Sequence, residues 1–412
     1  MPFINATISA RTKKANIIRM SALLLCLVLL SGCAVSNSVS WQRAETEAEN
    51  SVFSLSADTS FISELPSVSA KAAILIDGNT GKIIGVKNAD ARMSMASTTK
   101  IMTALVAIES CDISTTVAVS PDAVGVEGSS VYLYNGERLS LEDLLYAMLL
   151  ESANDAAAAI AIAVGGSIEG FAEMMNQKAE ELGLENTHFT NPHGLDNEEH
   201  YTTARELAII AGEALKNDAF RKIVSTYKKD IPLNETEGVR LLINHNKLLK
   251  LYDGSVGVKT GYTKKSGRCL VSAAERDGLF LICVTLNAPD DWKDHQTLLD
   301  YGFSLYESRI LCLDGEYRHI MPIVGGDQDY VVLTNNGDTR VTLPRGANDL
   351  QCSLELSNFE YAPIKQGDIC GNLIYTLDGK EVARIPLYAQ YSVDRATYKK
   401  NLWTFFTSVF GK

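Results

Sequence analysis

The chain has 412 residues, of which 46% are hydrophobic and 21% are charged, with a formal net charge of −12. This composition is typical of globular proteins and excludes a disordered or fibrous chain. The length is enough for two or three domains. The acidic balance argues against a nucleic-acid-binding protein, because such recognition normally requires a basic face.

Residues 1–33 are predicted to be a signal peptide. A basic stretch precedes an apolar run from Met20 to Leu30, which is too short to span a bilayer comfortably. The run ends in Leu-Ser-Gly-Cys33, which resembles the bacterial lipobox and makes Cys33 the expected lipidation site. The alternative is an ordinary secretory signal with a chance cysteine. Either way we expect the mature protein to work outside the cytoplasm, and a lipid on Cys33 would associate it with the membrane.

Residues 34–66 are rich in Ser, Glu, Ala and Thr, which predicts a flexible tether. From residue 67 to about 308 the pattern predicts an α/β (α+β) catalytic domain, in which a sheet and a helical cluster share a cleft. We expect a hairpin first, then a block of helices, then further strands. The segments concerned are 72–77 with 82–86, then 141–183, and then 255–260, 269–274 and 279–286.

Residues 312–392 are predicted to form a small all-β domain. Short β-like runs are joined there by Asn336-Gly337 and Asp378-Gly379, which are strong hairpin dipeptides. In residues 393–412 the apolar side chains recur on one face of a helix, and this aromatic face resembles an interfacial membrane anchor. The alternative is a terminal helix docked on its own domain.

No cofactor or metal is expected. The eight cysteines follow no disulfide or zinc rhythm, which favours buried inert thiols. The six histidines never fall at the i, i+4 spacing of a zinc peptidase.

Three short motifs, in order and widely spaced, carry the chemistry. They are Ser97-Thr-Thr-Lys100, Ser152-Ala-Asn154 and Lys259-Thr260-Gly261. Each alone is a weak signal, because its residues are common. Together they form the signature of serine enzymes that act on β-lactams or D-alanyl peptides, in which the first motif supplies the nucleophile.

The residue types fit nucleophilic catalysis by a serine. Lys100 follows Ser97 by three residues, so on a helix the two side chains share a face. A neutral lysine can take the serine proton, and repulsion from Lys259 together with desolvation would lower its pKa. Ser152 can relay a proton to a leaving group, and Asn154 can hold a substrate amide. The third motif ends a β-like run whose edge could pair with an extended peptide, with Gly261 allowing close approach.

At this point the chain, from residue 67 to 412, resembles the low-molecular-weight penicillin-binding proteins, specifically the serine-type D-alanyl-D-alanine carboxypeptidases. The likeness extends beyond the three motifs. It includes the segments 95–103, 186–189, 193–195, 201–205 and 244–249, the β domain and the C-terminal amphipathic segment.

The resemblance implies that Ser97 attacks the penultimate D-alanine of a peptidoglycan stem peptide, and that water then hydrolyses the acyl-enzyme. The backbone N–H groups of Ser97 and Tyr262 would form the oxyanion hole, and Lys259 and Thr260 would bind the terminal carboxylate. β-Lactams would acylate the same serine.

Two departures from the family pattern matter. Tyr262 stands where some relatives carry His, with little expected loss because this position acts through its backbone. His245 stands where some relatives carry Arg near the substrate carboxylate, so it is either a carboxylate ligand or a loop histidine without a role.

Three other functions share parts of this pattern. A D,D-endopeptidase would cut cross-links, although such relatives tend to lack a β domain. A class A-type β-lactamase would need a loop glutamate, and the 186–195 stretch has only Glu185 nearby. A non-catalytic wall-binding protein would show an eroded motif, and none is eroded.

Overall fold

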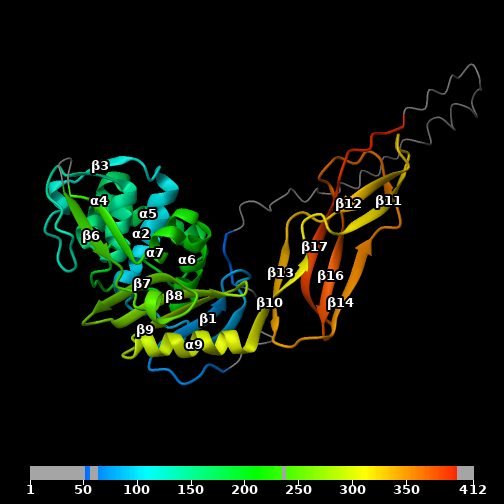
Figure 1. Cartoon of the computed structure of the whole chain (residues 1–412). Helices are drawn as coiled ribbons and strands as arrows, with labels where there is room; N and C mark the ends of the chain where they lie inside the picture. The colour runs from blue at the N-terminus through cyan, green and yellow to red at the C-terminus, as the bar shows by residue number, and fades with distance from the viewer. Residues whose placement is uncertain (1–51, 56–63, 234–237, 397–412) are drawn as a thin grey trace, which may run out of the picture. The chain divides into compact units, whose positions relative to one another are not determined.

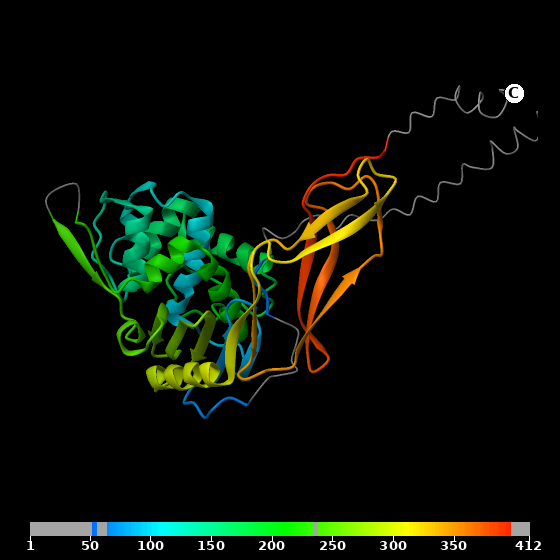
Figure 2. The same ribbon diagram turned by 45° about the vertical axis from the view of Figure 1, so that its right-hand side comes forward.

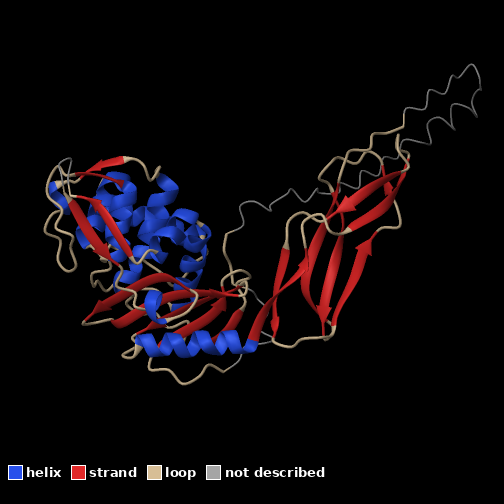
Figure 3. Ribbon diagram, viewed as in Figure 1, coloured by secondary structure: helices blue, strands red, loops and turns tan. Residues whose placement is uncertain are grey.

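The computed structural model of the chain describes residues 52–55, 64–233 and 238–396. Within these residues, a mixed helix-and-sheet domain is followed from Tyr306 onward by a domain of β-strands alone (Figure 1, Figure 3). The predicted fold class is confirmed. The expected signal peptide and Cys33 lie outside the described residues.

An antiparallel five-stranded sheet forms the base of the first domain, in the order β2-β1-β9-β8-β7. All five strands were predicted from the sequence, with bounds that differ by a few residues. The strands are β1 (Ala72–Asp77), β2 (Ile83–Lys87), β7 (Ser255–Thr263), β8 (Gly267–Arg276) and β9 (Leu279–Leu286). Because β7 is a terminal strand of this sheet, its outer edge has no strand partner among the described residues.

A cluster of helices covers one face of the sheet, and the long helix α9 (Asp291–Leu305) covers the other (Figure 1, Figure 2). A hydrophobic core lies on each face of the sheet. Strand β1 contributes side chains to both cores, because alternate side chains of a strand point to opposite faces. Its Ile74 and Ile76 join the core on the helical side, and its Leu75 joins the core under α9. The helical cluster contains α2 (Lys100–Ser110), α3 (Leu141–Leu150), α4 (Asn154–Gly165), α5 (Ile168–Glu181), α6 (Ala204–Lys216) and α7 (Asp218–Ser225).

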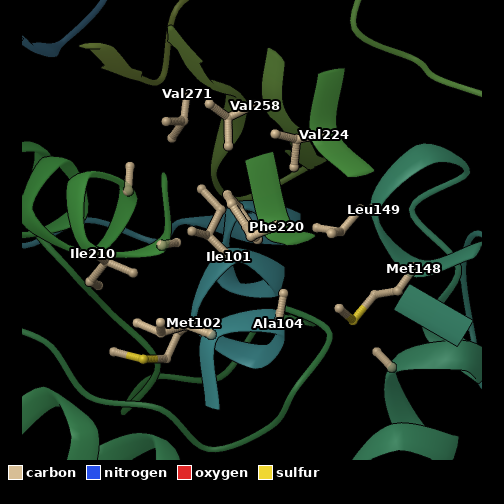
Figure 4. Close-up of a cluster of buried hydrophobic side chains, with 14 of the residues drawn as sticks. Ile101, Met102, Ala104, Met148, Leu149, Ile210, Phe220, Val224, Val258 and Val271 are labelled. Atoms are coloured by element: carbon tan, nitrogen blue, oxygen red, sulfur yellow. The ribbon is translucent and has the colours of Figure 1, made fainter. Parts of the chain in front are cut away.

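Helix α2 runs through the middle of this cluster. Its residues from Lys100 to Ala107 are all buried. Figure 4 shows Ile101, Met102 and Ala104 of α2 among apolar side chains from the helices and the sheet, namely Met148, Leu149, Ile210, Phe220, Val224, Val258 and Val271. A helix enclosed on all sides holds its first turn rigidly, and that turn carries the first motif.

Short elements complete the first domain. They are the 3₁₀ turns η1 (Ala96–Thr99) and η2 (Pro121–Ala123), the helix α8 (Leu248–Leu251), and the two-stranded pairs β3 (Thr116–Ala118) with β4 (Arg138–Ser140) and β5 (Lys228–Pro232) with β6 (Val239–Ile243).

The second domain contains eight strands. Six form a sheet in the order β14-β16-β17-β12-β11-β15, and β10 pairs with β13. The strands are β10 (Tyr306–Cys312), β11 (Arg318–Val324), β12 (Tyr330–Thr334), β13 (Thr339–Pro344), β14 (Leu350–Leu356), β15 (Glu360–Tyr361), β16 (Ile369–Leu377) and β17 (Lys380–Ala389).

Only one of the two predicted hairpin turns joins paired strands. Asp378-Gly379 links β16 to β17, and both residues have the positive φ that a tight two-residue turn requires. Asn336-Gly337 links β12 to β13, which lie in different sheets, so the hairpin interpretation is wrong there. The dipeptide fixes a local turn, whereas strand pairing is decided by long-range packing.

Two predicted segment boundaries also need correction. Phe53, placed by the sequence in the flexible tether, is buried and packs on α6, where its ring fills the space above Gly212. At the other end, Val393 and Arg395 form β-bridges to Ile364 and Gly326, so residues 393–396 are not helical. The rest of the predicted C-terminal helix, residues 397–412, lies outside the described residues.

All six cysteines of the described residues are free. Cys269, Cys283 and Cys312 are buried as expected, whereas Cys352 is exposed. No single helix of the described part is long and apolar enough to cross a membrane; by length and composition only α4 and α5 together qualify, and they meet at 81°.

Candidate active site

The three motifs converge on one cleft of about 340 Å³ between the helical cluster and the edge of β7. Its lining includes residues from all three motifs and from the segments that follow them. They are Ser97, Ser129, Ser152, His245, Lys247, Thr260, Gly261, Tyr262, Arg268, Asp291 and Trp292.

The nucleophile candidate lies on a tight turn rather than on an α-helix. Ser97 belongs to the 3₁₀ turn η1, and α2 begins only at Lys100. In a 3₁₀ turn, side chains three residues apart eclipse one another, which brings Lys100 Nζ to 3.0 Å from Ser97 Oγ. Ala96, immediately before the serine, has a positive φ of 48°. Such strained non-glycine positions concentrate at functional sites.

Lys100 Nζ has three oxygen neighbours. Besides Ser97 Oγ, it lies 2.7 Å from Asn154 Oδ1 and 2.6 Å from the main-chain oxygen of His193. A neutral amine has two N–H donors and one lone pair. The two carbonyl oxygens accept but cannot donate, so they take both N–H groups and leave the lone pair directed at the hydroxyl of Ser97. The geometry therefore suits a lysine that accepts the serine proton.

Burial explains how this lysine becomes neutral. Desolvation lowers the pKa of Lys100 well below its ordinary value, the nearby charge of Lys259 lowers it further, and Asp155 opposes both. Burial also lowers the pKa of Lys259 to about 7. Desolvation is therefore the larger cause of the lowered pKa of Lys100, and the charge repulsion expected from the sequence is the smaller one.

The loop that holds His193 is fastened to the nucleophile turn. Thr103 Oγ1 donates to the main-chain oxygen of Pro192 at 2.6 Å. Gly194 has a φ of 87°, and a Cβ there would lie 1.9 Å from the main-chain oxygen of Ala96. Only glycine fits this approach, because any side chain would displace either the loop or the turn.

A buried histidine adds a second connection. The N–H of Thr190 donates to His200 Nδ1 at 3.1 Å, so the neutral ring carries its proton on Nε2. That proton is donated to Thr99 Oγ1 at 2.7 Å, and the Thr99 hydroxyl donates to the main-chain oxygen of Ala96 at 2.7 Å. Burial lowers the pKa of His200 to about 4. Sequence reasoning did not single out this residue, because a lone histidine carries no motif.

The second motif lies between α3 and α4. Ser152 has a positive φ of 59°, is 7% exposed and lines the cleft. Asn154 is the first residue of α4, and its side-chain amide also donates to the main-chain oxygen of Glu127. Two hydrogen bonds from opposite ends of the amide fix the orientation in which Oδ1 faces Lys100.

The third motif lies on the terminal strand β7. Lys259 is 1% exposed, and its Nζ donates to the main-chain oxygen of Thr260 at 3.0 Å. A Cβ at Gly261 would lie 3.0 Å from the backbone nitrogen of Ser97. The glycine thus permits close packing of β7 on the nucleophile turn. Tyr262 follows with an exposed side chain.

The rim of the cleft carries charges that sequence reasoning only partly identified. His245 Nε2 lies 3.1 Å from Glu151 Oε2. Arg268, directly across from Tyr262 on β8, lies 3.3 Å from the buried carboxylate of Asp291. Arg268 was missed, because it belongs to none of the three motifs and enters the cleft only through the pairing of β7 with β8.

The chain matches known protein families over both domains. The family model for D-alanyl-D-alanine carboxypeptidases matches residues 59–290, and the model for the C-terminal domain of penicillin-binding protein 5 matches residues 306–395. The chain is 35% identical over 339 residues to D-alanyl-D-alanine carboxypeptidase DacF of Bacillus subtilis, covering 80% of this chain and 87% of that protein. It is 33% identical over 353 residues to the carboxypeptidase DacA of Escherichia coli K12, covering 81% and 86%.

Solved structures show the same likeness. Penicillin-binding protein 5 of Haemophilus influenzae is 29% identical, with a TM-score of 0.69 over 81% of this chain and 100% of that chain. Penicillin-binding protein 3 of Streptococcus pneumoniae is 27% identical, with a TM-score of 0.68 over 80% and 100%. The chain therefore belongs to the D-alanyl-D-alanine carboxypeptidase family of serine peptidases.

Proposed function

We propose that the protein hydrolyses the terminal D-alanyl-D-alanine bond of peptidoglycan stem peptides through an acyl-enzyme on Ser97, and so limits cross-linking. The observation that carries this proposal is the arrangement of Lys100 Nζ, 3.0 Å from Ser97 Oγ and held by two carbonyl oxygens. Membership of the carboxypeptidase family supports the substrate class.

We propose that acylation has three steps. Neutral Lys100 takes the proton of Ser97 as Oγ bonds to the carbonyl carbon of the penultimate D-alanine. The carbonyl oxygen becomes an oxyanion, for which the backbone N–H groups of Ser97 and Tyr262 are the proposed donors. The C–N bond then breaks, and the leaving D-alanine amine takes a proton that passes from Lys100 through the Ser152 hydroxyl.

Deacylation reverses these roles. A water molecule loses a proton to Lys100 and bonds to the ester carbon, and Ser97 Oγ leaves as the proton returns to it. The products are the shortened peptide carboxylate, free D-alanine and the regenerated serine. Asn154 remains bound to Lys100 throughout.

We propose that the terminal carboxylate of the substrate lies between Thr260 and Arg268. The free edge of β7 supports an extended peptide paired along this strand. Lys259 contributes positive charge from beneath, and Arg268 contributes a permanent charge at the rim. His245 is less suited to hold a carboxylate, because its ring already lies beside Glu151.

The test is release of D-alanine from a pentapeptide muropeptide by the wild type and by Ser97→Ala. We expect release by the wild type only, and labelling of Ser97 by a fluorescent penicillin. A folded wild type that is labelled yet releases no D-alanine would support the endopeptidase alternative, which cross-linked muropeptides would then reveal. Rapid loss of the label with hydrolysis of the penicillin would instead favour a β-lactamase.

We also propose that the protein is exported and held at a membrane, by lipid on Cys33, by the amphipathic segment 397–412, or by both. The lipobox-like sequence and the apolar stripe of the C-terminal segment support this. Fractionation of cells expressing the wild type, Cys33→Ala, and a chain ending at residue 396 tests it. We expect release from membranes only when both features are removed, and a wild type in the soluble fraction would overturn the proposal.

A further inference from the structure

The β domain exposes a contiguous apolar face. It consists of five large side chains that are between 44 and 67% exposed, and we call it the β11 face. Its members are Ile320 and Val324 of β11, Tyr330 of β12, Tyr361 of β15, and Phe359 just before β15. Isolated exposed apolar residues are common, whereas a gathered group indicates a binding surface.

Strand register places these residues on one side of the sheet. Along β11, Ile320, Pro322 and Val324 are exposed, whereas the alternating Met321 and Ile323 are buried in the domain core. Directly paired residues share a face, and the pairs here are Pro322 with Tyr330 and Val324 with Tyr361. Phe359 packs edge-on against Tyr361, with 5.4 Å between the ring centroids.

The chain leaves the β domain beside this face. The N–H of Ala396 donates to the main-chain oxygen of Gly325 at 2.9 Å, and Arg395 forms a bridge with Gly326. Gly325 directly follows Val324. The segment that begins here, 397–412, has an apolar stripe, three lysines and no acidic residue. Ala396, after which this segment begins, therefore lies close to the β11 face.

We propose that the β11 face rests on a lipid membrane surface together with the segment 397–412. This rests on the membrane association proposed above. A segment lying in the membrane interface would hold Gly325 at the headgroup level, and Val324 with Tyr361 beside it. Tyrosine and other aromatic rings are favoured at that depth. Stable attachment usually requires two signals, because one modest anchor binds reversibly.

The charges around the face make the proposal specific. Acidic and basic side chains are balanced there: Asp327 and Asp329 lie in the β11–β12 turn and Asp394 precedes the exit, against Arg318 on β11, Lys365 and Arg395. The face therefore contributes by apolar contact and not by attraction to anionic headgroups. Removing its rings should weaken binding to neutral and anionic vesicles by the same factor, whereas the lysines of the segment account for any preference for anionic lipid.

The experiment uses a chain of residues 34–412, which lacks the predicted signal peptide and Cys33 and so carries no lipid there. Binding to phosphatidylcholine vesicles, with and without phosphatidylglycerol, is measured by co-sedimentation. The test variant is Phe359→Ser with Tyr361→Ser. The matched control is Leu354→Ser on β14, the strand at the opposite end of the sheet order, whose side chain is also exposed. Thermal unfolding and D-alanine release check that each variant is folded.

We expect the double variant to bind both vesicle types at least tenfold more weakly, and the control to bind like the wild type. Equal binding by the double variant would overturn the inference while leaving the C-terminal anchor intact. Tighter binding would also overturn it, because the β11 face would then bind segment 397–412 itself and keep that segment away from the lipid. Failure of the unsubstituted chain to bind any vesicles would refute attachment through segment 397–412 and this inference with it, whatever the result for D-alanine release.

Discussion

The main-chain oxygen of His193 accepts a 2.6 Å hydrogen bond from Lys100 Nζ, so a loop far along the chain from the first motif helps to orient the candidate base. Because the contact is made by backbone, no replacement of the His193 side chain removes it directly. The position of the loop can instead be changed through Gly194, which approaches Ala96 too closely for any side chain.

We expect Gly194→Ala to abolish acylation by penicillin, because the added Cβ displaces the His193 carbonyl from Lys100. Gly183→Ala is the matched control: its φ is 69°, also positive, but a Cβ there meets no atom within 4 Å. The control should lose about 1–2 kcal/mol of stability from backbone strain and keep its acylation rate. Equal acylation by both variants, at temperatures where both are folded, would show that the loop does not orient Lys100.

Asn154 provides the second acceptor for Lys100. Asn154→Ala leaves a buried N–H of the base without its partner, and a loss of about 1–3 kcal/mol predicts a roughly 5- to 150-fold slower acylation. Asn154→Asp should be worse at neutral pH, because a carboxylate stabilises the charged lysine and raises its pKa. The two variants separate in a pH profile: the aspartate variant should recover rate as the pH rises, and the alanine variant should not. Identical profiles would contradict this electrostatic account.

The two buried lysines predict a specific pH dependence. Lys100 acts as a base only when neutral, and positive Lys259 helps to keep it so. Lys259→Met removes that charge, so the acid limb of the acylation–pH profile should move to higher pH, and the maximal rate should fall as well. Lys265→Met, in the exposed β7–β8 turn, is the control. An unmoved acid limb in Lys259→Met would mean that the limb belongs to another group.

The same substitution should change how stability depends on pH. The pKa of Lys259 is about 7 in the folded chain and 10.5 is its ordinary value, so between these pH values the unfolded chain binds more protons. The free energy of unfolding therefore rises with pH in this window, by at most about 1.4 kcal/mol per pH unit for this lysine. Denaturant unfolding measured from pH 7 to 10 should show that the free energy of unfolding rises less steeply with pH in Lys259→Met than in the wild type.

Much of the fold was predictable because its strands and helices follow local patterns. The strands of the central sheet are apolar runs separated by turn residues, and Asp378-Gly379 encodes its hairpin directly. Helix α9 was not predicted, because its Asp291 and Asp294 are buried and interrupt the apolar period. Phe53 was assigned to a tether, because a single aromatic residue in a polar segment gives no sign that it packs over Gly212.

Some groups of the candidate site were likewise predictable from the sequence, and others were not. The motif residues Ser97, Lys100 and Asn154 were predicted together from chemistry that repeats across serine enzymes, and the structure brings them into contact. The carbonyl of His193 and the guanidinium of Arg268 were not predicted, because they reach the cleft through tertiary packing and strand register. Backbone groups in particular have no residue type from which a role could be inferred.

Buried histidines predict loss of stability in acid. The pKa of His200 is about 4 in the folded chain, below its ordinary value of 6.5. As the pH falls from 6.5 to 4, the unfolded chain therefore binds a proton at this histidine that the folded chain does not bind. A proton on Nδ1 would also oppose the N–H of Thr190. Stability should fall by up to about 1.4 kcal/mol per pH unit for this residue. We expect His200→Gln to flatten the acid side of the stability–pH curve, and an equally steep fall in this variant would contradict the account.

Arg268 provides a last test of how the substrate lies in the cleft. If its guanidinium binds the terminal carboxylate, Arg268→Ala should raise KM for a D-alanyl-D-alanine peptide roughly 10- to 100-fold, as expected for the loss of a hydrogen bond between charged groups. The effect on kcat should be smaller, because the contact exists before and during the reaction. A peptide that ends in a carboxamide lacks the charge, so wild type and variant should process it with similar KM. Lys264→Ala, an exposed lysine in the same β7–β8 hairpin, controls for the loss of general positive potential. If Arg268→Ala weakens both peptides equally, the arginine acts through its contact with Asp291 and not on the carboxylate.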